Sequence, residues 1–437
     1  MSELSLPQRL RRLALSGSSR ATMIVFLSNL TASLLGFAST LFATRALGPS
    51  SFGVVATGTA LMTTIVGMTD LGLGTTGVRF ISEYIHTNTP RAYAFLKVIF
   101  RFEVVLGLFI LTIGALISPW IAGRLGNTPN SVVYLAFIGA AALSAAVFYN
   151  IILQSYQRFA YFSILGIING SVRLIALITL YSTHNVTAIN VLTAYALAPY
   201  VGLLVGFLVI PRDFLKQHDA ELEKEAVRKI ITYGKWPMIS FILMSMIARL
   251  DTLILKRYYP DSEVGIYGAA QQLALLLPLL IGSLTSVLLP KAGSAQTTAE
   301  LRSFTRKSLV GSVGILIVLI PFVLLSPYLV QFILGDKYAA AVPAFQILFC
   351  GDLLSLFANP GSVVLFRLNR PYIATYANML QFVLAITLYS LIIPHYGSIG
   401  AAWGNLIITF ASSFIILPPV ILFLLRKDNL PLEEPAK

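Results

Sequence analysis

The sequence predicts an all-α polytopic membrane protein, with twelve transmembrane helices in two six-helix lobes related by a pseudo-twofold axis along the membrane normal. Its composition is 57% hydrophobic and only 11% charged over 437 residues, which leaves too little polar surface to cover the chain in water. Apolar runs recur at close to the ~20 residues that a helix needs to cross a bilayer. Long continuous runs such as 308–334 favour helices over an outer-membrane β-barrel, because a helix closes its backbone hydrogen bonds within one segment.

Twelve apolar segments follow one another along the chain. They lie near residues 23–43, 54–78, 98–122, 131–153, 163–182, 191–210, 237–255, 266–289, 308–334, 342–366, 373–393 and 401–425. The polar stretch 211–236 separates the sixth segment from the seventh. We therefore expect an N-terminal lobe over 1–210 and a C-terminal lobe over 237–437 that ends in a short cytoplasmic tail.

The basic residues give the spans an orientation. Of 31 Lys and Arg, 23 fall on the side of the N-terminus, 5 on the opposite side and 3 inside spans. Cytoplasmic loops carry the excess of positive charge, so both termini are expected in the cytoplasm, with the protein in the cytoplasmic (inner) membrane. Topology and anionic headgroups account for the net charge of +13, and no nucleic-acid partner is expected.

A repeat relates the two halves of the sequence. A shift of 212 residues places Arg45 on Arg257, Gly53 on Gly265, Arg79 on Lys291 and Arg158 on Arg370, and "ISPWIAGRLG" matches "LSPYLVQFILG" at a shift of 208 to 209. Six spans are an even number, so both halves have the same orientation. Repeats of this kind are typical of transporters whose substrate site lies between the halves.

The stretch 211–236 is predicted to form a connector helix on the cytoplasmic surface. Leu222, Ala226 and Ile230 form an apolar stripe, and Glu225 and Lys229 are spaced for an ion pair on the wet side. A packed structural connector is favoured over a binding element.

Charged residues inside spans are the candidate functional groups, because a charge at the centre of a spanning helix costs ~2.5–3.5 kcal/mol on insertion scales. The basic ones are Arg101, Arg173 and Arg249, and the acidic ones are Asp70, Glu103, Asp251 and Asp352. Arg173 and Asp352 lie near the midplane of their spans, and Arg101 lies close enough to a span end to reach headgroups. Arg249 and Asp251 are about 200° apart on a helix, so we expect them to face different neighbours.

Other chemistry finds little support in the sequence. A P-loop motif is absent, the four histidines are scattered, and no loop has room for a catalytic domain, so neither an enzyme nor a cofactor or metal site is expected. The "DLGLGTTG" stretch at 70–77 reads as a glycine-rich bend. Asp70 there is either a satisfied helix-end carboxylate or a coupling group.

Two longer stretches carry a family resemblance: "RLDTLILKRYYPDSEVGIYGAAQQLALLLP" and "TRALGPSSFGVVATGTALMTTIVGMTDLGLGTTGVRF". Both resemble the polysaccharide-transporter branch of the multidrug/oligosaccharidyl-lipid/polysaccharide flippase superfamily, which includes the O-antigen flippases. The likeness runs from about residue 20 to 425. It implies alternating access by two six-helix lobes and translocation of a polyprenyl-diphosphate-linked oligosaccharide. It also implies membrane lipids as partners, H⁺ or Na⁺ as a coupling ion, and contact with the polymerase and glycosyltransferases of the same pathway.

On this reading, four arginines are candidates for binding the diphosphate, because a guanidinium donates two parallel hydrogen bonds to phosphate. They are Arg173, Arg249, Arg45 and Arg257, of which the last two equally suit a role as topology or headgroup anchors. Asp70, Asp352 and Asp251 are candidates for coupling or gating, and a static Arg173–Asp352 pair is as acceptable as a gating one. Pro278, Pro321 and Pro360 either loosen their helices where bending accompanies alternating access or are inert kinks.

Three alternative functions stay open. A multidrug or cation exporter of the same superfamily would have a more acidic cavity. A peptidoglycan lipid-precursor flippase would need two more spans. A membrane glycosyltransferase or polymerase would need a larger external loop with catalytic carboxylates.

Overall fold

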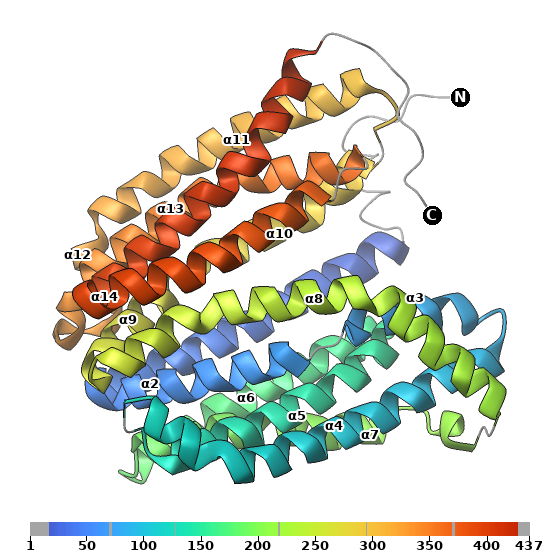
Figure 1. The fold of residues 1–437 in the computed structure, drawn as a ribbon, viewed down its shortest axis with the longest axis horizontal. Coiled ribbons are helices and arrows are strands. Elements are labelled where there is room, and N and C mark those ends of the chain that lie inside the picture. Colours follow the sequence, from blue (N-terminus) through green and yellow to red (C-terminus); the bar gives the residue numbers. More distant parts are fainter. Residues whose placement is uncertain are drawn as a thin grey trace. The chain divides into compact units, whose positions relative to one another are not determined.

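The structure is a computed structural model that describes residues 17–69, 72–126, 128–216, 219–293, 295–368 and 372–426. Every element within these ranges is helical (Figure 1). The elements, in chain order, are α2 (Gly17–Thr69), α3 (Leu73–Tyr84), α4 (Thr89–Arg124), α5 (Asn130–Ser155), α6 (Phe159–Ser182), α7 (Ala188–Val209), η1 (Asp213–Lys216), α8 (Ala220–Tyr258), α9 (Asp261–Ala274), α10 (Leu276–Gly293), α11 (Thr298–Leu324), α12 (Ser326–Leu334), η2 (Asp336–Ala341), α13 (Val342–Arg367) and α14 (Tyr372–Leu425).

Within the described ranges, nine helices are long and apolar enough to cross a membrane. Two of them are much longer than one crossing requires: 40 residues over Leu30–Thr69 and 50 residues over Tyr376–Leu425. Each bends at a glycine with positive φ, Gly48 at 74° and Gly397 at 57°, a region that residues with a Cβ rarely adopt. The all-helical membrane architecture predicted from the sequence is therefore confirmed.

Prolines break two of the predicted spans. The predicted span 266–289 divides into α9 and α10 at Leu275, three residues before Pro278, whose ring excludes the carbonyl of the preceding turn. The predicted span 308–334 divides into α11 and α12 just before Pro327, which takes a position in the first turn of α12. Pro321 and Pro360, in contrast, lie inside helices that continue unbroken.

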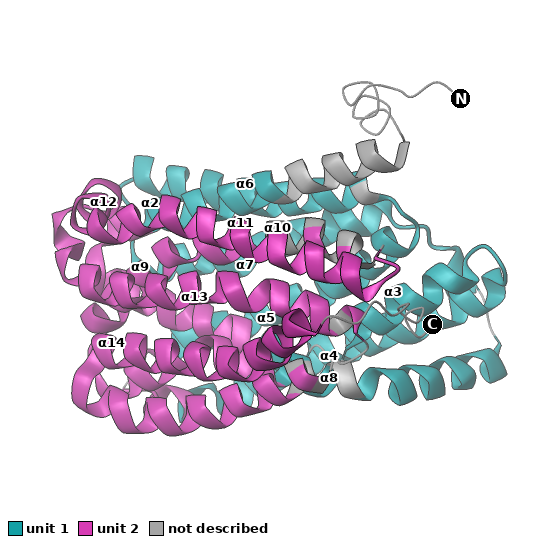
Figure 2. Ribbon diagram, turned by 90° about the horizontal axis from the view of Figure 1, so that it is seen from above, with its two compact units in different colours: residues 1–43, 65–120, 130–242 teal, residues 44–64, 121–129, 243–437 magenta. Residues whose placement is uncertain are grey.

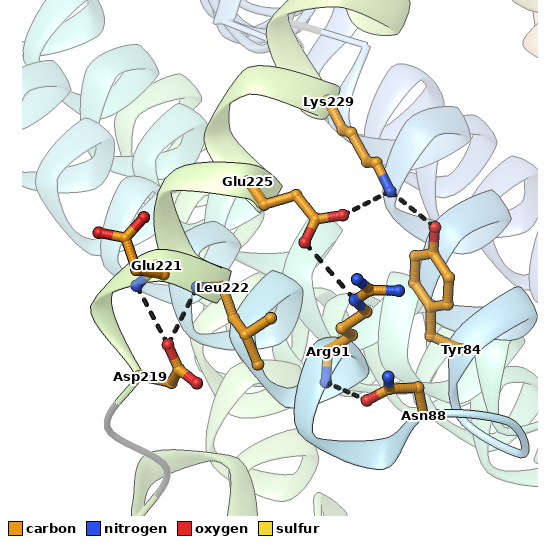
Figure 3. A network of polar contacts seen from close by, with 8 residues as sticks. All are labelled: Tyr84, Asn88, Arg91, Asp219, Glu221, Leu222, Glu225 and Lys229. Atoms are coloured by element: carbon orange, nitrogen blue, oxygen red, sulfur yellow. Dashed lines mark hydrogen bonds and ion pairs between the residues drawn. The ribbon is translucent and has the colours of Figure 1, made fainter.

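The connector is not a separate helix as predicted. After the short turn η1, α8 runs for 39 residues from Ala220 to Tyr258, through the predicted start of the seventh span at 237. Asp219 caps it by accepting hydrogen bonds from the backbone N–H groups of Glu221 and Leu222, both at 3.1 Å (Figure 3). The sequence pattern placed a boundary at the change from polar to apolar residues, but the helix continues through it, and Gly234 near that point does not have a positive φ.

The chain divides into two compact units, which are coloured in Figure 2. Unit 1 contains residues 1–43, 65–120 and 130–242, and unit 2 contains residues 44–64, 121–129 and 243–437. The boundaries differ from the predicted lobes because the compact units follow spatial contacts and so collect short stretches from the other half. The lobe boundaries at 210 and 237 remain a prediction.

Each unit has its own apolar core. In unit 1, Phe80 and Ile81 of α3 pack with Phe95 and Ile99 of α4 and with Ile152 of α5, all nearly inaccessible to solvent. In unit 2, residues of α10 and α11 pack against α13, through Ala292, Leu301 and Val364. α3 shows how the sequence directs this burial, because its buried positions recur every three or four residues along one face.

Two glycines bring helix backbones into direct contact within unit 2. A Cβ on Gly53 would lie 1.8 Å from the carbonyl oxygen of Asp261, and a Cβ on Gly265 would lie 1.9 Å from that of Pro49. Residues 49 and 261, like 53 and 265, are 212 positions apart. The two contacts are thus equivalent under the shift that relates the two halves of the sequence, and glycine is required at both positions.

Candidate substrate and coupling sites

Arg173 lies in unit 1, on α6. Its guanidinium stacks over the ring of Tyr195 from α7, 4.2 Å from the ring centre. Its Nε is buried and makes no hydrogen bond, and the same holds for the Oδ1 of Asn169, one helical turn earlier, and the hydroxyl of Tyr195. These polar atoms come from adjacent parts of α6 and α7, and the hydroxyls of Ser39 and Thr40 of α2 lie close to that of Tyr195, so together they form one polar cluster.

This arrangement suits an anion. A half-buried cation without a carboxylate partner among the described residues is costly to maintain inside a span, and the stacked aromatic ring compensates only part of the lost hydration. A phosphate oxygen would accept hydrogen bonds from the guanidinium and supply the missing charge. The cluster therefore combines a cation with unused hydrogen-bonding atoms, as an anion-binding site requires.

Asp251, in unit 2, differs from Arg173 because its side chain is 1% exposed and its carboxylate oxygens are hydrogen-bonded. Its carboxylate accepts hydrogen bonds from the hydroxyl of Tyr267 at 2.7 Å, the side-chain amide of Gln271 at 2.8 Å, and the backbone N–H and hydroxyl of Thr252 at 2.5 and 3.1 Å. Tyr267 and Gln271 are one turn apart on α9, so the carboxylate holds α8 against that helix. A buried charge with so many donors is a structural anchor.

Arg249 and Asp251 do not have separate surroundings, contrary to the prediction. The Nη1 of Arg249 lies 3.4 Å from the Oε1 of Gln271, whose amide nitrogen bonds Asp251. The angle of about 200° separates the two charges on α8, but the amide group of Gln271 on α9 contacts both of them. The guanidinium of Arg249 therefore also helps to neutralise the buried carboxylate.

Asp352, on α13, makes no hydrogen bond or ion pair with the part of the chain that the structure describes. A carboxylate inside a span without a partner is a candidate for binding a proton or a metal cation. No ion pair of the described residues includes Arg173 either. The predicted pair between the two remains a prediction.

Arg45 and Arg257 make equivalent contacts in unit 2. Arg45 donates to the carbonyl oxygen of Phe332 near the end of α12, at 2.6 Å, and Arg257 donates to that of Arg124 at the end of α4. The two arginines are related by the shift of 212, and the two acceptors by the shift of 208. Basic side chains that bond the last carbonyls of a helix stabilise its C-terminus, so these contacts favour the anchor role over substrate binding.

The remaining charged residues differ in their surroundings. Arg101 bonds Glu223 of α8 at 2.7 Å, so it has a protein partner as well as access to headgroups. Glu103 is buried and accepts a hydrogen bond from the hydroxyl of Ser144 at 3.1 Å. Asp70, Arg370 and the side chain of Lys291 lie outside the described part of the chain. Among the described residues, no group of three His, Cys, Asp or Glu could hold a metal ion.

Sequence reasoning missed the neutral members of both clusters. Tyr195 and Asn169 carry no charge and stand in apolar segments, although the spacing of Asn169 and Arg173 by four residues puts them on one helix face. Tyr267 and Gln271 show the same spacing within "YGAAQ". The spacing of four could have pointed to Asn169 beside Arg173 and to the pair Tyr267 and Gln271, but Tyr195 stands on another helix and has no such signal in the sequence.

The sequence comparisons agree on one family. The model of the polysaccharide biosynthesis protein family matches residues 18–296, more than half of the chain. A probable low-salt glycan biosynthesis flippase of Haloferax volcanii is 24% identical over 88% of this chain and 79% of its own length. The lipopolysaccharide biosynthesis protein WzxC of Escherichia coli is 26% identical over 44% of this chain and 40% of its own length.

Solved structures show the same fold. An inward-facing multidrug resistance MATE transporter of the MOP superfamily has a TM-score of 0.71 at 15% identity, covering 91% of this chain and 96% of its own. The lipid II flippase MurJ in an inward closed conformation has a TM-score of 0.71 at 13% identity, covering 92% and 89%. At these identities the likeness shows the fold alone. Together with the match over residues 18–296, it leads to one conclusion: the chain belongs to the polysaccharide biosynthesis protein family and has the helical membrane fold of the MOP superfamily.

Proposed function

We propose that this protein is a flippase, not an enzyme, that moves a polyprenyl-diphosphate-linked oligosaccharide across the cytoplasmic membrane by alternating access. Family membership supports this proposal, as does the relative named as a glycan biosynthesis flippase, which aligns over most of the chain. The fold is shared with a flippase of another lipid-linked precursor. The single observation that carries the proposal is the polar cluster of Arg173, Asn169 and Tyr195, because an anionic diphosphate needs a cation that can bind it and then release it.

The finer architecture belongs to the proposal. The nine apolar helices become eleven spans when α2 is divided at Gly48 and α14 at Gly397. The end of α8, over the predicted span 237–255, is the twelfth. The equivalent contacts of Gly53 and Gly265, and of Arg45 and Arg257, support two six-helix lobes with a pseudo-twofold relation. In this account both termini face the cytoplasm, as the basic residues indicate.

The coupling groups are assigned by their surroundings. Asp352 has no hydrogen bond or ion pair with the described residues, so binding and release of H⁺ or Na⁺ there would break no contact with them. Asp251 is held by four donated hydrogen bonds, so its role is to fix α8 against α9. Arg249 remains a candidate ligand of the diphosphate that is held in place through Gln271. The polymerase and glycosyltransferases of the pathway are the proposed protein partners.

Export of cationic drugs is the second candidate, because the multidrug transporter and the lipid II flippase are equally similar in fold, both at a TM-score of 0.71. The cation at Arg173 disfavours it, since a positive group repels a cationic substrate. Purified protein in liposomes separates the two functions. A flippase makes a lipid-linked oligosaccharide accessible on the opposite leaflet and leaves an ethidium gradient unchanged, whereas an exporter gives the reverse result.

A further inference from the structure

A groove between α4 and α8, within unit 1, has no role in the proposed translocation. It consists of two adjoining cavities of about 810 and 250 Å³, which share Val98, Val227 and Ile231 in their linings. The larger lies near the start of α8 and the smaller continues along α4 to Phe102 and along α8 to Met238. We call the two cavities together the α4/α8 groove.

The wall of the groove formed by α8 carries two parallel stripes. Val227, Ile231 and Met238 form an apolar stripe, and Val227 and Ile231 are 42% and 65% exposed although both are large and hydrophobic. Lys224, Arg228 and Lys235 form a basic stripe beside it. The spacings of four and seven residues within each set align it along the helix, and an offset of three residues puts the two stripes side by side, about 60° apart.

The charges in the groove are positive in balance. Arg101 from α4 joins the three cations of α8, and Glu223 is the one carboxylate of the lining. Glu223 is already bound to Lys97 at 2.9 Å and to Arg101 at 2.7 Å, and Lys224 pairs with Glu221 outside the lining. Arg228 is exposed and makes no hydrogen bond or ion pair with the described residues. Its guanidinium is therefore available to an external anion.

The arrangement of basic and apolar residues along the α4/α8 groove indicates the kind of ligand that fits it. Arg101, Lys224 and Arg228 line the larger cavity, on the polar first turns of α8, and the smaller cavity is mainly apolar with Lys235 also in its lining; it follows α4, a candidate membrane span that starts at Thr89. A ligand that fits has a negative head and a hydrocarbon tail, joined end to end along the direction of the span. An acidic peptide would have to place charge against the apolar end, at a desolvation cost.

We propose that the α4/α8 groove binds an anionic glycerophospholipid of the surrounding membrane. Its phosphate lies against Arg228 and Arg101, and one acyl chain lies on Val98, Val227 and Ile231. Basic side chains near a membrane attract anionic lipids, and apolar contact with the chain keeps one molecule in place. The inference goes beyond the proposed function and does not depend on which substrate is moved.

The test uses a fluorescent probe inside the groove. Thr232 lines the larger cavity and is exposed, so Thr232→Cys in a Cys350→Ser background takes a bimane label. The labelled protein is reconstituted with phosphatidylglycerol or phosphatidylcholine that carry the same doxyl-labelled acyl chain, and bimane quenching is measured against lipid mole fraction. We expect phosphatidylglycerol to reach half-maximal quenching at a mole fraction at least fivefold lower than phosphatidylcholine.

Two pairs of variants distinguish a site from general attraction. Arg228→Gln should reduce the preference for phosphatidylglycerol about fivefold, the ratio that corresponds to ~1 kcal/mol for one basic residue near a membrane surface, and Arg228→Lys should keep part of it. Ile231→Asn should weaken quenching by both lipids. The matched controls, Arg158→Gln at another exposed helix end and Leu204→Asn on the exposed surface of α7, should leave both properties unchanged.

Three results would overturn the proposal. Equal quenching by the two lipids would show that no headgroup is recognised. An effect of Arg158→Gln as large as that of Arg228→Gln would show diffuse attraction instead of a site. Absence of quenching by either lipid would show that lipid does not enter the groove and would leave a peptide as its occupant.

Discussion

At the scale of single residues, the charges inside the membrane fall into two kinds. Asp251 has a full set of donors, whereas Arg173 has an aromatic ring and an Nε without a partner. The sequence identified both positions, because a charge in an apolar run stands out. The sequence could not distinguish the two kinds of charge. Their partners are mostly neutral residues on other helices, and only the fold determines how close those helices lie.

The fully hydrogen-bonded carboxylate of Asp251 should be essential for the stability of the fold. Asp251→Ala leaves the hydroxyl of Tyr267 and the amide of Gln271 buried without an acceptor and leaves Arg249 without its counter-charge. Removing one partner from a buried charged network costs about 3–5 kcal/mol. We expect a clearly lower midpoint of thermal unfolding in detergent. Asp352→Ala is the matched control and should leave the midpoint nearly unchanged, since no partner is orphaned. Equal midpoints for the two variants would refute the anchor role of Asp251.

At the scale of elements, the sequence predicted helices well and their ends less well. Apolar length located the spans, but the bends at Gly48 and Gly397 and the break before Pro327 depend on backbone geometry. The sequence did not predict the continuity of α8 because its first turns are polar; ion pairs with α4 and a hydrogen bond to Tyr84 of α3 stabilise them. Figure 3 shows Glu225 between Arg91 at 3.5 Å and Lys229 at 2.7 Å, with Lys229 also donating to Tyr84 at 2.8 Å.

The ion pairs of α8 predict a dependence of stability on pH. The hydrogen bond from Lys97, helped by the charge of Arg101, lowers the pKa of Glu223 from its ordinary value of 4.5. A carboxyl group with a lowered pKa stabilises the fold above its ordinary pKa and loses that contribution as the pH falls through the folded value. Glu223→Gln should therefore cost about 2 kcal/mol at pH 7.5, since nearly buried Lys97 loses this ion pair, and the difference in stability from the parent should shrink below pH 4.5.

The control for this experiment is Glu221→Gln. Its pair with Lys224 is almost fully exposed, so the cost should stay under about 1 kcal/mol at any pH. Thermal unfolding at pH 7.5 and at pH 4 measures both variants. The assigned ion pairs would be contradicted if the unfolding midpoint of Glu223→Gln differed from that of the parent by the same amount at both pH values.

The two glycines at the helix–helix contacts, Gly53 and Gly265, predict the effect of alanine substitutions on stability. Gly53→Ala and Gly265→Ala place a methyl group against a backbone carbonyl, so the helices must move apart at a cost of at least about 1–3 kcal/mol. Gly36→Ala is the control, because nothing lies within 4 Å of its new Cβ and alanine favours a helix. Unfolding midpoints should fall for the first two variants and stay level or rise for the third. Tolerance of alanine at both close positions would argue against the contact.

At the scale of the whole molecule, composition and repeat predicted the membrane class and the family-level fold. The shift of 212 predicted that equivalent residues exist, and the contacts of Gly53 with Asp261 and of Gly265 with Pro49 follow it. The sequence could not show that both pairs touch, since repeat spacing carries no information on distance between helices. Membrane orientation was inferred from charge alone and remains a prediction.

Cysteine labelling tests the orientation at positions that the structure shows to be exposed. Two residues of predicted loops are unsuitable: a Cβ on Gly126 would meet the carbonyl oxygen of Lys256 at a position of positive φ, and Thr298 is buried. In the Cys350→Ser background, cysteines at the exposed positions Asn185 and Lys337 should react with an impermeant maleimide from outside intact cells. A cysteine at Lys216 should react only after permeabilisation. External labelling at Lys216 would invert or break the twelve-span topology.

The most direct test of the central claim is translocation by purified protein in liposomes that contain a fluorescent polyprenyl-diphosphate-linked oligosaccharide. Chemical bleaching from outside measures how much of the lipid reaches the outer leaflet. We expect rapid exchange with the parent protein, at least a tenfold loss with Arg173→Gln and partial recovery with Arg173→Lys, because an ammonium keeps the charge but not the two parallel hydrogen bonds. The midpoints of thermal unfolding should match in all three proteins, since no described residue forms an ion pair with Arg173 that the substitution would break. Exchange by Arg173→Gln at the parental rate, with matched protein amounts, would contradict the role of this arginine, and no exchange by the parent would contradict the function.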